Sequence, residues 1–270
     1  MADFLDRTLT SAALCWRIER RDGVAIGFTS HDRDLVIDDF VYRAAPGMLP
    51  SEVTLSDGFE AGGLDVRGAL TSDAIRADDL AAGRWDGAAV RLFMVDWTAP
   101  GAGRLHVARG ELGEVSIQGA GFEAELKGAT AALDRPVVEQ TSPECRAALG
   151  DKRCRVDMAA RTRLTRVVSC EGARVEVAEA AAGNAHAFGR LRWIGGANSG
   201  LDSAILASAG TRLTLREPPP FAPAAGDLVE IAEGCDKSLA TCAGRFANAA
   251  NFRGEPHLPG IDLLTRYPGA

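Results

Sequence analysis

The sequence predicts a mainly β protein, with two antiparallel β-barrel or sandwich-like domains, short helices, and a four-cysteine metal site at the base of the second domain. The first basis is the period-two alternation of apolar and polar residues in many short stretches, which is typical of half-buried strands. The second is the abundance of glycine, 30 of 270 residues, which suits many turns between short strands. The third is a change of pattern at Ser142-Pro143, after which a new series of strands begins.

These observations divide the chain into three parts. We predict an N-terminal β domain over residues 1–135, a cysteine-clamped β domain over residues 136–246, and a C-terminal arm over residues 247–270. A chain of 270 residues is long enough for one large or two ordinary domains and can bury a real core. The arm is rich in Asn, Gly and Pro and has few periodic apolar positions, so we expect it to order only on contact, against a neighbouring subunit.

The N-terminal domain is expected to be a series of hairpins with one short helix. Its elements, in chain order, are a hairpin over residues 13–29 turning at Asp22-Gly23, a hairpin over residues 35–42 turning at Asp38-Asp39, two short strands within residues 52–70, a helix capped by Ser72 and ending near Gly83, an apolar strand over residues 90–97, and a hairpin over residues 110–127 turning at residues 119–121. The last hairpin has the cleanest alternation in the chain, with one apolar and one charged face.

A helix of about two turns is predicted where the pattern changes. Ser142 suits the N-cap position, Pro143 the first helical residue, and Gly150 the end of the helix. Cys145 would then lie in the first turn, where the helix dipole favours a thiolate, and Cys154 would follow just beyond the end.

The second domain is expected to be built from strands and to end in a short helix. The predicted strands cover residues 165–168, 175–177, 191–193, 204–207, 213–215 and 227–231. The last of them runs directly into Gly234-Cys235. Asp236 is expected to cap a short helix that carries Leu239 and Cys242.

Composition and charge argue against several classes of protein. The net charge of −7 opposes a specific nucleic-acid site, because phosphate binding requires a concentrated basic surface. No run approaches the roughly 18 apolar residues that would cross a bilayer, so we predict no membrane segment. The first residues lack the apolar core of a secretion signal, and we therefore expect folding in a reducing cytoplasm, where clustered cysteines are more often metal ligands than disulfides.

Four of the six cysteines form two close pairs, which are separated by the predicted strands of the second domain. Cys145 and Cys154 have eight residues between them, and Cys235 and Cys242 have six. Thiolates select zinc, copper(I) or iron–sulfur clusters, and four of them complete a zinc site or a four-iron cluster. Because the ends of a domain usually lie close together, the two pairs can meet at the base of the second domain.

Two questions about this site stay open at the level of the residues. The alternative to convergence is that the four cysteines are simply small buried residues, which is the role expected of Cys15 and Cys170. If a metal is bound, the spacings are loose for a zinc knuckle and favour an iron–sulfur cluster, with zinc as the second choice.

Catalytic motifs are missing from the sequence. The four histidines lie in unrelated contexts, and no nucleophile elbow, metalloprotease helix or phosphate-binding loop is found. The site residues are accordingly four metal ligands and no catalytic group. A metal-dependent or redox enzyme on a β scaffold, a structural zinc protein and a zinc-stabilised nucleic-acid binder are the competing interpretations. The histidines are His31, His106, His186 and His257; the last is a candidate fifth ligand, but four thiolates already fill the site.

Several motifs together resemble one known family over nearly the whole chain. It is the hub (baseplate) protein of alphaproteobacterial gene transfer agents and related prophages, a conserved phage protein family of unknown function. The cysteine spacing is also remotely similar to that of the lambda tail-tip protein L, which carries an iron–sulfur cluster. The motifs are Leu14-Cys15-Trp16-Arg17, Gly27-Phe28-Thr29-Ser30-His31-Asp32-Arg33-Asp34-Leu35, Gly68-Ala69-Leu70, Arg109-Gly110-Glu111-Leu112-Gly113-Glu114-Val115, Glu217-Pro218-Pro219-Pro220-Phe221, Gly234-Cys235-Asp236-Lys237, Ala240-Thr241-Cys242, Arg245-Phe246 and, most specific, Asn251-Phe252-Arg253-Gly254-Glu255-Pro256-His257.

The resemblance implies a structural virion component and not an enzyme. It implies a homotrimeric ring in the tail baseplate, assembled in the host cytoplasm, between the distal tail protein and the large tip or fibre-bearing tail protein. It also implies one [4Fe-4S] cluster per subunit, carried over onto Cys145, Cys154, Cys235 and Cys242. Such a cluster would stabilise the second domain in a compartment where a disulfide would not persist.

Overall fold

The fold is described from a computed structural model, which covers residues 11–44, 49–50, 63–69, 76–118, 121–128 and 138–258. Of residues 49–50, 63–69, 114–118 and 121–125 the backbone alone is described. Two compact units divide the chain, Met1–Val137 and Val138–Ala270. No helix in the described part of the chain is long and apolar enough to cross a membrane.

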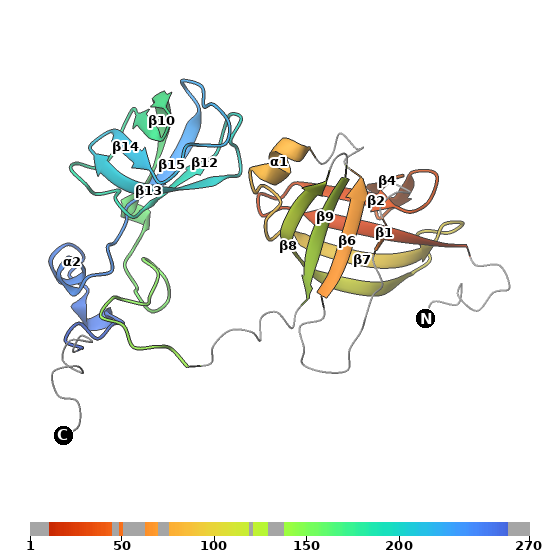
Figure 1. Ribbon diagram of the computed structural model, residues 1–270, viewed down its shortest axis with the longest axis horizontal. Coiled ribbons are helices and arrows are strands. Elements are labelled where there is room, and N and C mark those ends of the chain that lie inside the picture. Colours follow the sequence, from red (N-terminus) through yellow and green to blue (C-terminus); the bar gives the residue numbers. More distant parts are fainter. Residues whose placement is uncertain are drawn as a thin grey trace. The chain divides into compact units, whose positions relative to one another are not determined.

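The first unit is built on one nine-stranded sheet (Figure 1), whose strands follow in the order β3-β4-β2-β1-β7-β8-β9-β6-β5. All neighbouring strands are antiparallel except β2 and β4, which run parallel. The elements are β1 Ala12–Glu19, β2 Ala25–Thr29, β3 Leu35–Ile37, β4 Phe40–Ala44, β5 Leu49–Pro50, β6 Gly63–Ala69, α1 Ala77–Ala81, β7 Ala89–Asp96, β8 Arg104–Gln118 and β9 Gly121–Gly128.

The sheet of the first unit is buried on both faces around β1. Trp16 and Ile18 pack on one side in a cluster that includes Leu80 of α1. Cys15 packs on the other side, in a cluster that includes Tyr42 and Phe93. Each such side chain, once fully buried, contributes about 1.5–3 kcal/mol of hydrophobic stabilisation. The alternation along β1 therefore fixes its register and holds the centre of the sheet in place.

The predicted hairpins of the first unit are confirmed where the structure describes them. β1 pairs with β2 around Gly23, whose φ of 88° is the left-handed conformation that glycine adopts readily. β3 pairs with β4 around Asp38 and Asp39, whose φ values of 51° and 58° match a two-residue hairpin turn. The predicted cap Ser72 and the turn at residues 119–120 lie outside the described residues.

The first unit differs from the predicted barrel or sandwich, because its strands form one sheet with two edges in the described part of the chain. β3 has three residues and β5 has two, so each end of the sheet offers only a short edge to pair with. The helix predicted to end near Gly83 is confirmed as α1, which starts after Arg76.

The second unit contains a closed six-stranded antiparallel barrel, which confirms the predicted β domain. Its strands follow in the order β10-β11-β14-β13-β12-β15. The barrel interior is filled by fully buried side chains that include Trp193, Leu213 and Ile231. The elements are a 3-10 helix Ala159–Arg161, β10 Thr162–Glu171, β11 Arg174–Val177, β12 Arg190–Trp193, β13 Asp202–Ala209, β14 Arg212–Leu215, β15 Leu228–Ala232, α2 Leu239–Gly244 and a 3-10 helix Ala249–Asn251.

The helix predicted over residues 143–149 is wrong, because this stretch is irregular. Its backbone N–H groups are used by distant segments instead of by an intrahelical ladder. Cys145 donates its N–H to the carbonyl of Lys237 at 2.9 Å, and Arg146 donates to the carbonyl of Arg253 at 3.0 Å. Cys145 therefore does not lie in the first turn of a helix.

The short helix predicted after Cys235 is present as α2, but its cap is another residue. Ser238 occupies the N-cap position and accepts a hydrogen bond from the Thr241 N–H at 3.1 Å. Asp236 lies two residues earlier and accepts hydrogen bonds from the Ser238 N–H and the Thr241 hydroxyl. Both side chains fix the start of α2, which carries Cys242.

Candidate metal centre

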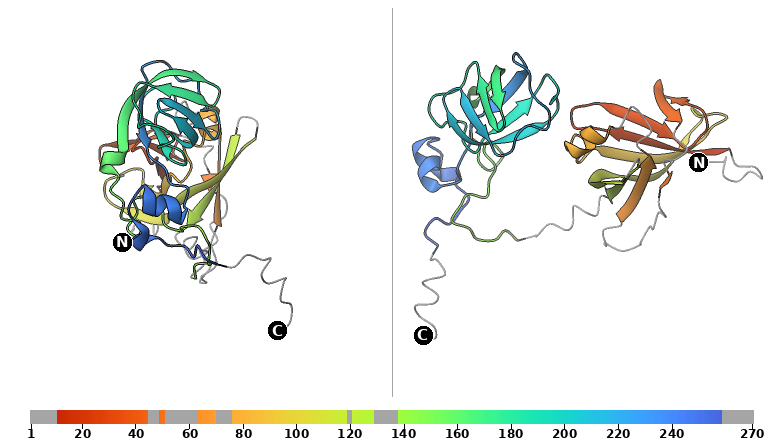
Figure 2. Two further views of the ribbon diagram at one scale, coloured as in Figure 1. Left: turned by 90° about the vertical axis from the view of Figure 1, so that its left-hand side faces the viewer. Right: turned by 45° about the horizontal axis from the view of Figure 1, so that its top comes forward.

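The pairing of the first and last barrel strands brings the two cysteine pairs to one end of the second unit. β10 and β15 are antiparallel neighbours, and Thr162 at the start of β10 lies opposite Ala232 at the end of β15. Cys154 precedes β10, while Cys235 follows β15 and leads into α2. The two views in Figure 2 show α2 beyond the barrel, next to the segment that precedes β10. The segment before β10 and the segment after β15 therefore lie at the same end of the barrel.

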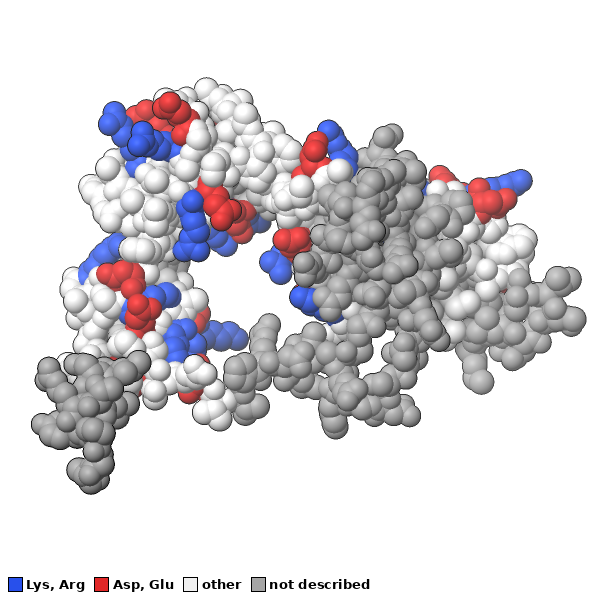
Figure 3. Space-filling model, viewed as in Figure 1, with Lys and Arg blue, Asp and Glu red and all other residues white. Residues whose placement is uncertain are grey.

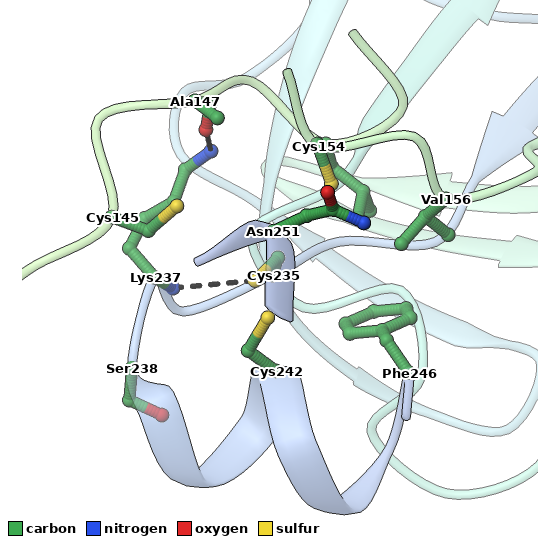
Figure 4. A pocket seen from close by; sticks show the side chains of 11 residues that line it. Cys145, Ala147, Cys154, Val156, Cys235, Lys237, Ser238, Cys242, Phe246 and Asn251 are labelled. Atoms are coloured by element: carbon green, nitrogen blue, oxygen red, sulfur yellow. Dashed lines mark hydrogen bonds between the residues drawn. The ribbon is translucent and has the colours of Figure 1, made fainter. Parts of the chain in front are cut away.

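Cys145, Cys154, Cys235 and Cys242 all line one cavity at this base. Figure 4 shows the four sulfur atoms directed toward a shared space. The cavity has about 310 Å³ of space between atoms, counting the part that opens to solvent. All four cysteines are free thiols. The other lining residues are Ala147, Leu149, Val156, Lys237, Ser238, Phe246 and Asn251.

Three of the four sulfur atoms face N–H donors. The backbone N–H of Lys237 donates to Cys235 Sγ at 3.4 Å, and that of Arg253 donates to Cys145 Sγ at 3.4 Å. The side-chain amide of Asn248 lies 3.7 Å from Cys154 Sγ. Cys242 Sγ instead donates to the carbonyl of Asn248 at 3.4 Å. N–H donors around sulfur stabilise the thiolate form, which is the form that binds metal.

Polar contacts hold the segments around the cavity together. Lys237 Nζ donates to the carbonyl of Ala147 at 2.6 Å, which ties the second cysteine pair to the first. Glu233 accepts from both Arg161 and Arg245, at 2.8 and 2.7 Å. The two guanidinium groups also lie over the ring of Phe246, at 4.8 and 4.9 Å from its centre. The entry to β10, the exit from β15 and α2 are thus joined without any metal.

Burial raises the pKa of the Cys235 and Cys242 thiols above the ordinary value. At Cys235 the N–H of Lys237 opposes this rise in the pKa, and at Cys242 the neighbouring thiols add to it. These two thiols are therefore protonated at neutral pH in the metal-free protein, and metal binding would release their protons.

Four thiols in one cavity are a donor set of the kind that binds zinc or an iron–sulfur cluster. Among the described residues, no set of three or more His, Cys, Asp or Glu side chains has a geometry that could hold a single ion. A tetrahedral zinc site, with Zn–S bonds of about 2.3 Å, would bring its sulfur atoms to about 3.8 Å from one another. The four thiols share the cavity but are not drawn together into such a set.

The remaining cysteines lie away from the cavity. Cys15 is fully buried in the first unit, and its thiol points to the Thr29 hydroxyl at 3.6 Å. Cys170 lies in β10 and pairs with Val175. Cys15 is buried as predicted, whereas Cys170 is only half-buried.

The four histidines do not line the cavity either. His31 stacks near Trp97, with ring centres 5.0 Å apart, and His106 lies in β8 near Phe93. His186 is fully buried, whereas His257 is exposed. The sequence analysis missed Lys237, Asn248 and Asn251 as residues of the site, although two of them stand in motifs that carried the resemblance.

Acidic and basic side chains are interspersed on the surface. Figure 3 shows Lys and Arg beside Asp and Glu on the visible face of the described residues, without a continuous basic stripe. Paired examples from the second unit are Arg146 with Glu255 at 2.6 Å and Arg190 with Glu230 at 3.5 Å. A mixed surface of this kind is not the concentrated positive field that phosphate binding requires.

Comparisons with known proteins agree with the resemblance. Residues 1–157 match the family model described as "Baseplate hub protein, N-terminal attachment domain", and residues 184–262 match the model described as "Phage conserved hypothetical protein BR0599". A solved chain from the "Virion of native gene transfer agent (GTA) particle" is similar, with 37% sequence identity and a TM-score of 0.86. The alignment covers 98% of this chain and 94% of that one. A search among curated protein sequences finds no match.

Proposed function

This chain belongs to the baseplate hub protein family, and we propose that it is a structural hub in the tail of a gene transfer agent or related phage-like particle. The observation that carries the proposal is the similarity to a gene transfer agent virion chain, at 37% identity over 98% of this chain. Similarity over both units, and not over one module, favours the same role for the whole protein. The role is one of assembly and force transmission and not of catalysis.

The proposed partners are two further copies of this chain, the distal tail protein and the large tip protein. The edge of the sheet in the first unit supports a contact of this kind. Val36 and Val41 lie opposite each other on the β3–β4 hairpin and are 60% and 48% exposed. β3 is an edge strand, so its backbone groups and these two side chains are available to a neighbouring protein.

The proposed cofactor is one [4Fe-4S] cluster held by Cys145, Cys154, Cys235 and Cys242. The support is their convergence on one cavity, together with sequence spacings that are loose for a zinc knuckle. When bound, the cluster would supply four iron–thiolate bonds that join both ends of the barrel. The apolar wall formed by Leu149, Val156 and Phe246 would shield these sulfur atoms from water.

A cluster that joins the two ends of the barrel gives a reason for a tail component to carry such a site. A hub must keep its fold while force passes through the tail. Glu233, Arg161, Arg245 and Lys237 already tie the ends of the barrel by hydrogen bonds. Because hydrogen bonds at a surface exchange with water, their net contribution is about 0.5–1.5 kcal/mol each. A covalent cross-link between the same ends would resist separation far more strongly.

Metal analysis tests the cofactor. Protein purified without oxygen is expected to be brown and to contain iron and inorganic sulfide in near-equal amounts, about four of each per chain. Cys235→Ser should remove most of both, while the control Cys170→Ser, outside the cavity, should retain them. One zinc per chain would replace the cluster by a zinc site, and protein with neither metal would return the four cysteines to a purely structural role.

Particle assembly tests the hub role. Deleting the gene in a producing strain is expected to give tails without a baseplate when viewed by electron microscopy, and the wild-type gene should restore them. Complete baseplates in the deletion strain would refute the role. Substrate turnover that requires the cavity would instead support the competing view, a metal-dependent or redox enzyme.

A further inference from the structure

The first half of the C-terminal arm closes over the thiol cavity. We call residues 248–258 the clasp. Asn248 lies four residues beyond the end of α2 and donates its backbone N–H to the carbonyl of Cys242 at 2.9 Å. From there the clasp crosses to the segment of the first cysteine pair, where the Arg253 carbonyl accepts from the Arg146 N–H at 3.0 Å. The clasp therefore touches both sides of the cavity.

Asn248 is the central contact of the clasp. Its side-chain amide donates to the Cys154 carbonyl at 2.6 Å and lies 3.7 Å from Cys154 Sγ. The main-chain carbonyl of Asn248 accepts a hydrogen bond from the Cys242 thiol. Asn251 donates to Asn248 Oδ1 at 2.7 Å. Because that oxygen is occupied, the NH₂ group of Asn248 is the end that faces Cys154. Asn248 thus connects three parts of the site, two cysteines and the clasp.

The far end of the clasp is fixed to the first cysteine segment. The carboxylate of Glu255 accepts hydrogen bonds from both terminal nitrogens of Arg146, at 2.6 and 2.9 Å, and from the Ser142 N–H at 2.9 Å. At Gly254 the backbone passes so close to the carbonyl of Glu144 that a Cβ atom would overlap it. This close approach places the Arg253 N–H against Cys145 Sγ.

We propose that Asn248 is a positioning residue that couples occupancy of the thiol cavity to closure of the clasp. The proposal rests on the proposed function, since it concerns the same four thiols. A hydrogen bond to a thiolate is stronger than one to a neutral thiol, because the acceptor is charged. Metal binding therefore strengthens the donation from Asn248 to Cys154 and from the Arg253 N–H to Cys145. By reciprocity, a closed clasp raises the affinity of the cavity for its occupant.

Through this coupling, occupancy of the cavity can control the contact of one hub subunit with its neighbours. A subunit with an occupied cavity holds its clasp more firmly in the closed position, and a neighbouring subunit or tail protein can recognise that ordered surface. The residues of the clasp are therefore expected to contribute to a subunit contact after the cavity is filled. Hydrogen bonds to sulfur also raise the reduction potential of an iron–sulfur cluster, so Asn248 has a second measurable effect.

Limited trypsin digestion of the full chain tests the coupling. Arg253 lies in the clasp and is exposed, so cleavage after it reports whether the clasp is closed. Anaerobically purified protein is compared with the same protein stripped by an oxidant and a chelator, and iron and sulfide are measured in both. Cleavage after Arg253 is expected to be at least about tenfold faster in the stripped protein, a ratio that corresponds to about 1.4 kcal/mol.

Three variants separate positioning from general packing. Asn248→Ala and Asn248→Asp are both expected to speed cleavage after Arg253 in the loaded protein and to lower the reduction potential. Aspartate has nearly the same shape as asparagine but no N–H to donate, so a packing role would be rescued by Asp and a donor role would not. The matched control is Asn198→Ala, because Asn198 holds Phe221 by hydrogen bonds in the barrel and contacts no cysteine.

The outcomes distinguish this inference from the proposed function. Equal cleavage of loaded and stripped wild-type protein, or a normal reduction potential in Asn248→Asp, would overturn the coupling while the iron and sulfide content still supported the cluster. Zinc in place of iron would overturn the cluster, yet protection of Arg253 by zinc would support the clasp. Protein without any metal would overturn both.

Discussion

Removing the metal should weaken the second unit by an amount that follows from its topology. Cys154 and Cys235 stand at the two ends of the barrel, with residues 155–234 between them. For a closed loop of about 80 residues, the chain-entropy relation gives a stabilisation of about 4.5 kcal/mol at 25 °C. For a domain of roughly this size, 1 kcal/mol changes the melting temperature by about 3–5 °C. Stripped protein is therefore expected to melt about 15 °C lower than loaded protein.

Differential scanning calorimetry under anaerobic conditions is the appropriate assay. Loaded wild-type protein, stripped wild-type protein and the Cys235→Ser variant are compared, with Cys170→Ser as the matched control. The stripped protein and Cys235→Ser should melt at similar low temperatures, and Cys170→Ser should melt with the loaded wild type. The same melting temperature for loaded and stripped protein would refute the reasoning, because a cross-link between the barrel ends must restrict the unfolded chain.

Three further predictions concern the support of the site. Ser238→Ala removes the N-cap of α2 and should lower the free energy of unfolding by about 1 kcal/mol in urea titrations. Gly234→Ala places a Cβ against the backbone of Ala187 and Phe188, so its metal content and soluble yield should fall sharply. Arg146 holds the pKa of Glu255 at about 2, below its usual 4.5, so this pair stabilises the clasp above about pH 4.5 and loses its effect as the pH falls toward 2. Cleavage of the clasp by an acid-active protease should therefore rise over that range in wild type and stay nearly constant in Glu255→Gln.

Each of these predictions has a contrary result. An unchanged urea midpoint in Ser238→Ala would mean that Asp236 alone caps α2. Normal metal content in Gly234→Ala would mean that the close backbone approach at that position is not required. Cleavage of the clasp that depends equally on pH in wild type and in Glu255→Gln would assign the acid sensitivity to another group.

Hairpins were well predicted because their signals are local. In β1 the alternation of Trp16 and Ile18 with polar residues is set by the pleat of the strand itself, and Gly23 supplies the turn. The same applies to β10 and β11 around Gly172. Whether the strands close into a barrel is not a local property: the second unit closes, and the described strands of the first unit form an open sheet, although both show similar patterns.

The helix predicted over residues 143–149 failed for the opposite reason. Ser142, Pro143 and Gly150 are good local signals for a helix, and Ser142 does accept the Glu144 N–H at 3.2 Å. However, the N–H groups of Cys145 and Arg146 bond to carbonyls of residues 237 and 253. A segment of about two turns gains little from its own ladder, since isolated short helices are marginal in water. Tertiary acceptors therefore decided its conformation.

The sequence by itself determined which atoms can form the site: four thiols in two close pairs, on either side of a set of strands. Thiol chemistry and spacing are written in the chain and need no fold to be read. Only the tertiary structure decided that β10 and β15 are neighbours, that the sulfur atoms share one cavity, and that Asn248 reaches Cys154. The physical reason is that strand neighbours and side-chain donors from distant segments are chosen by the packing of the whole barrel, which no local pattern encodes.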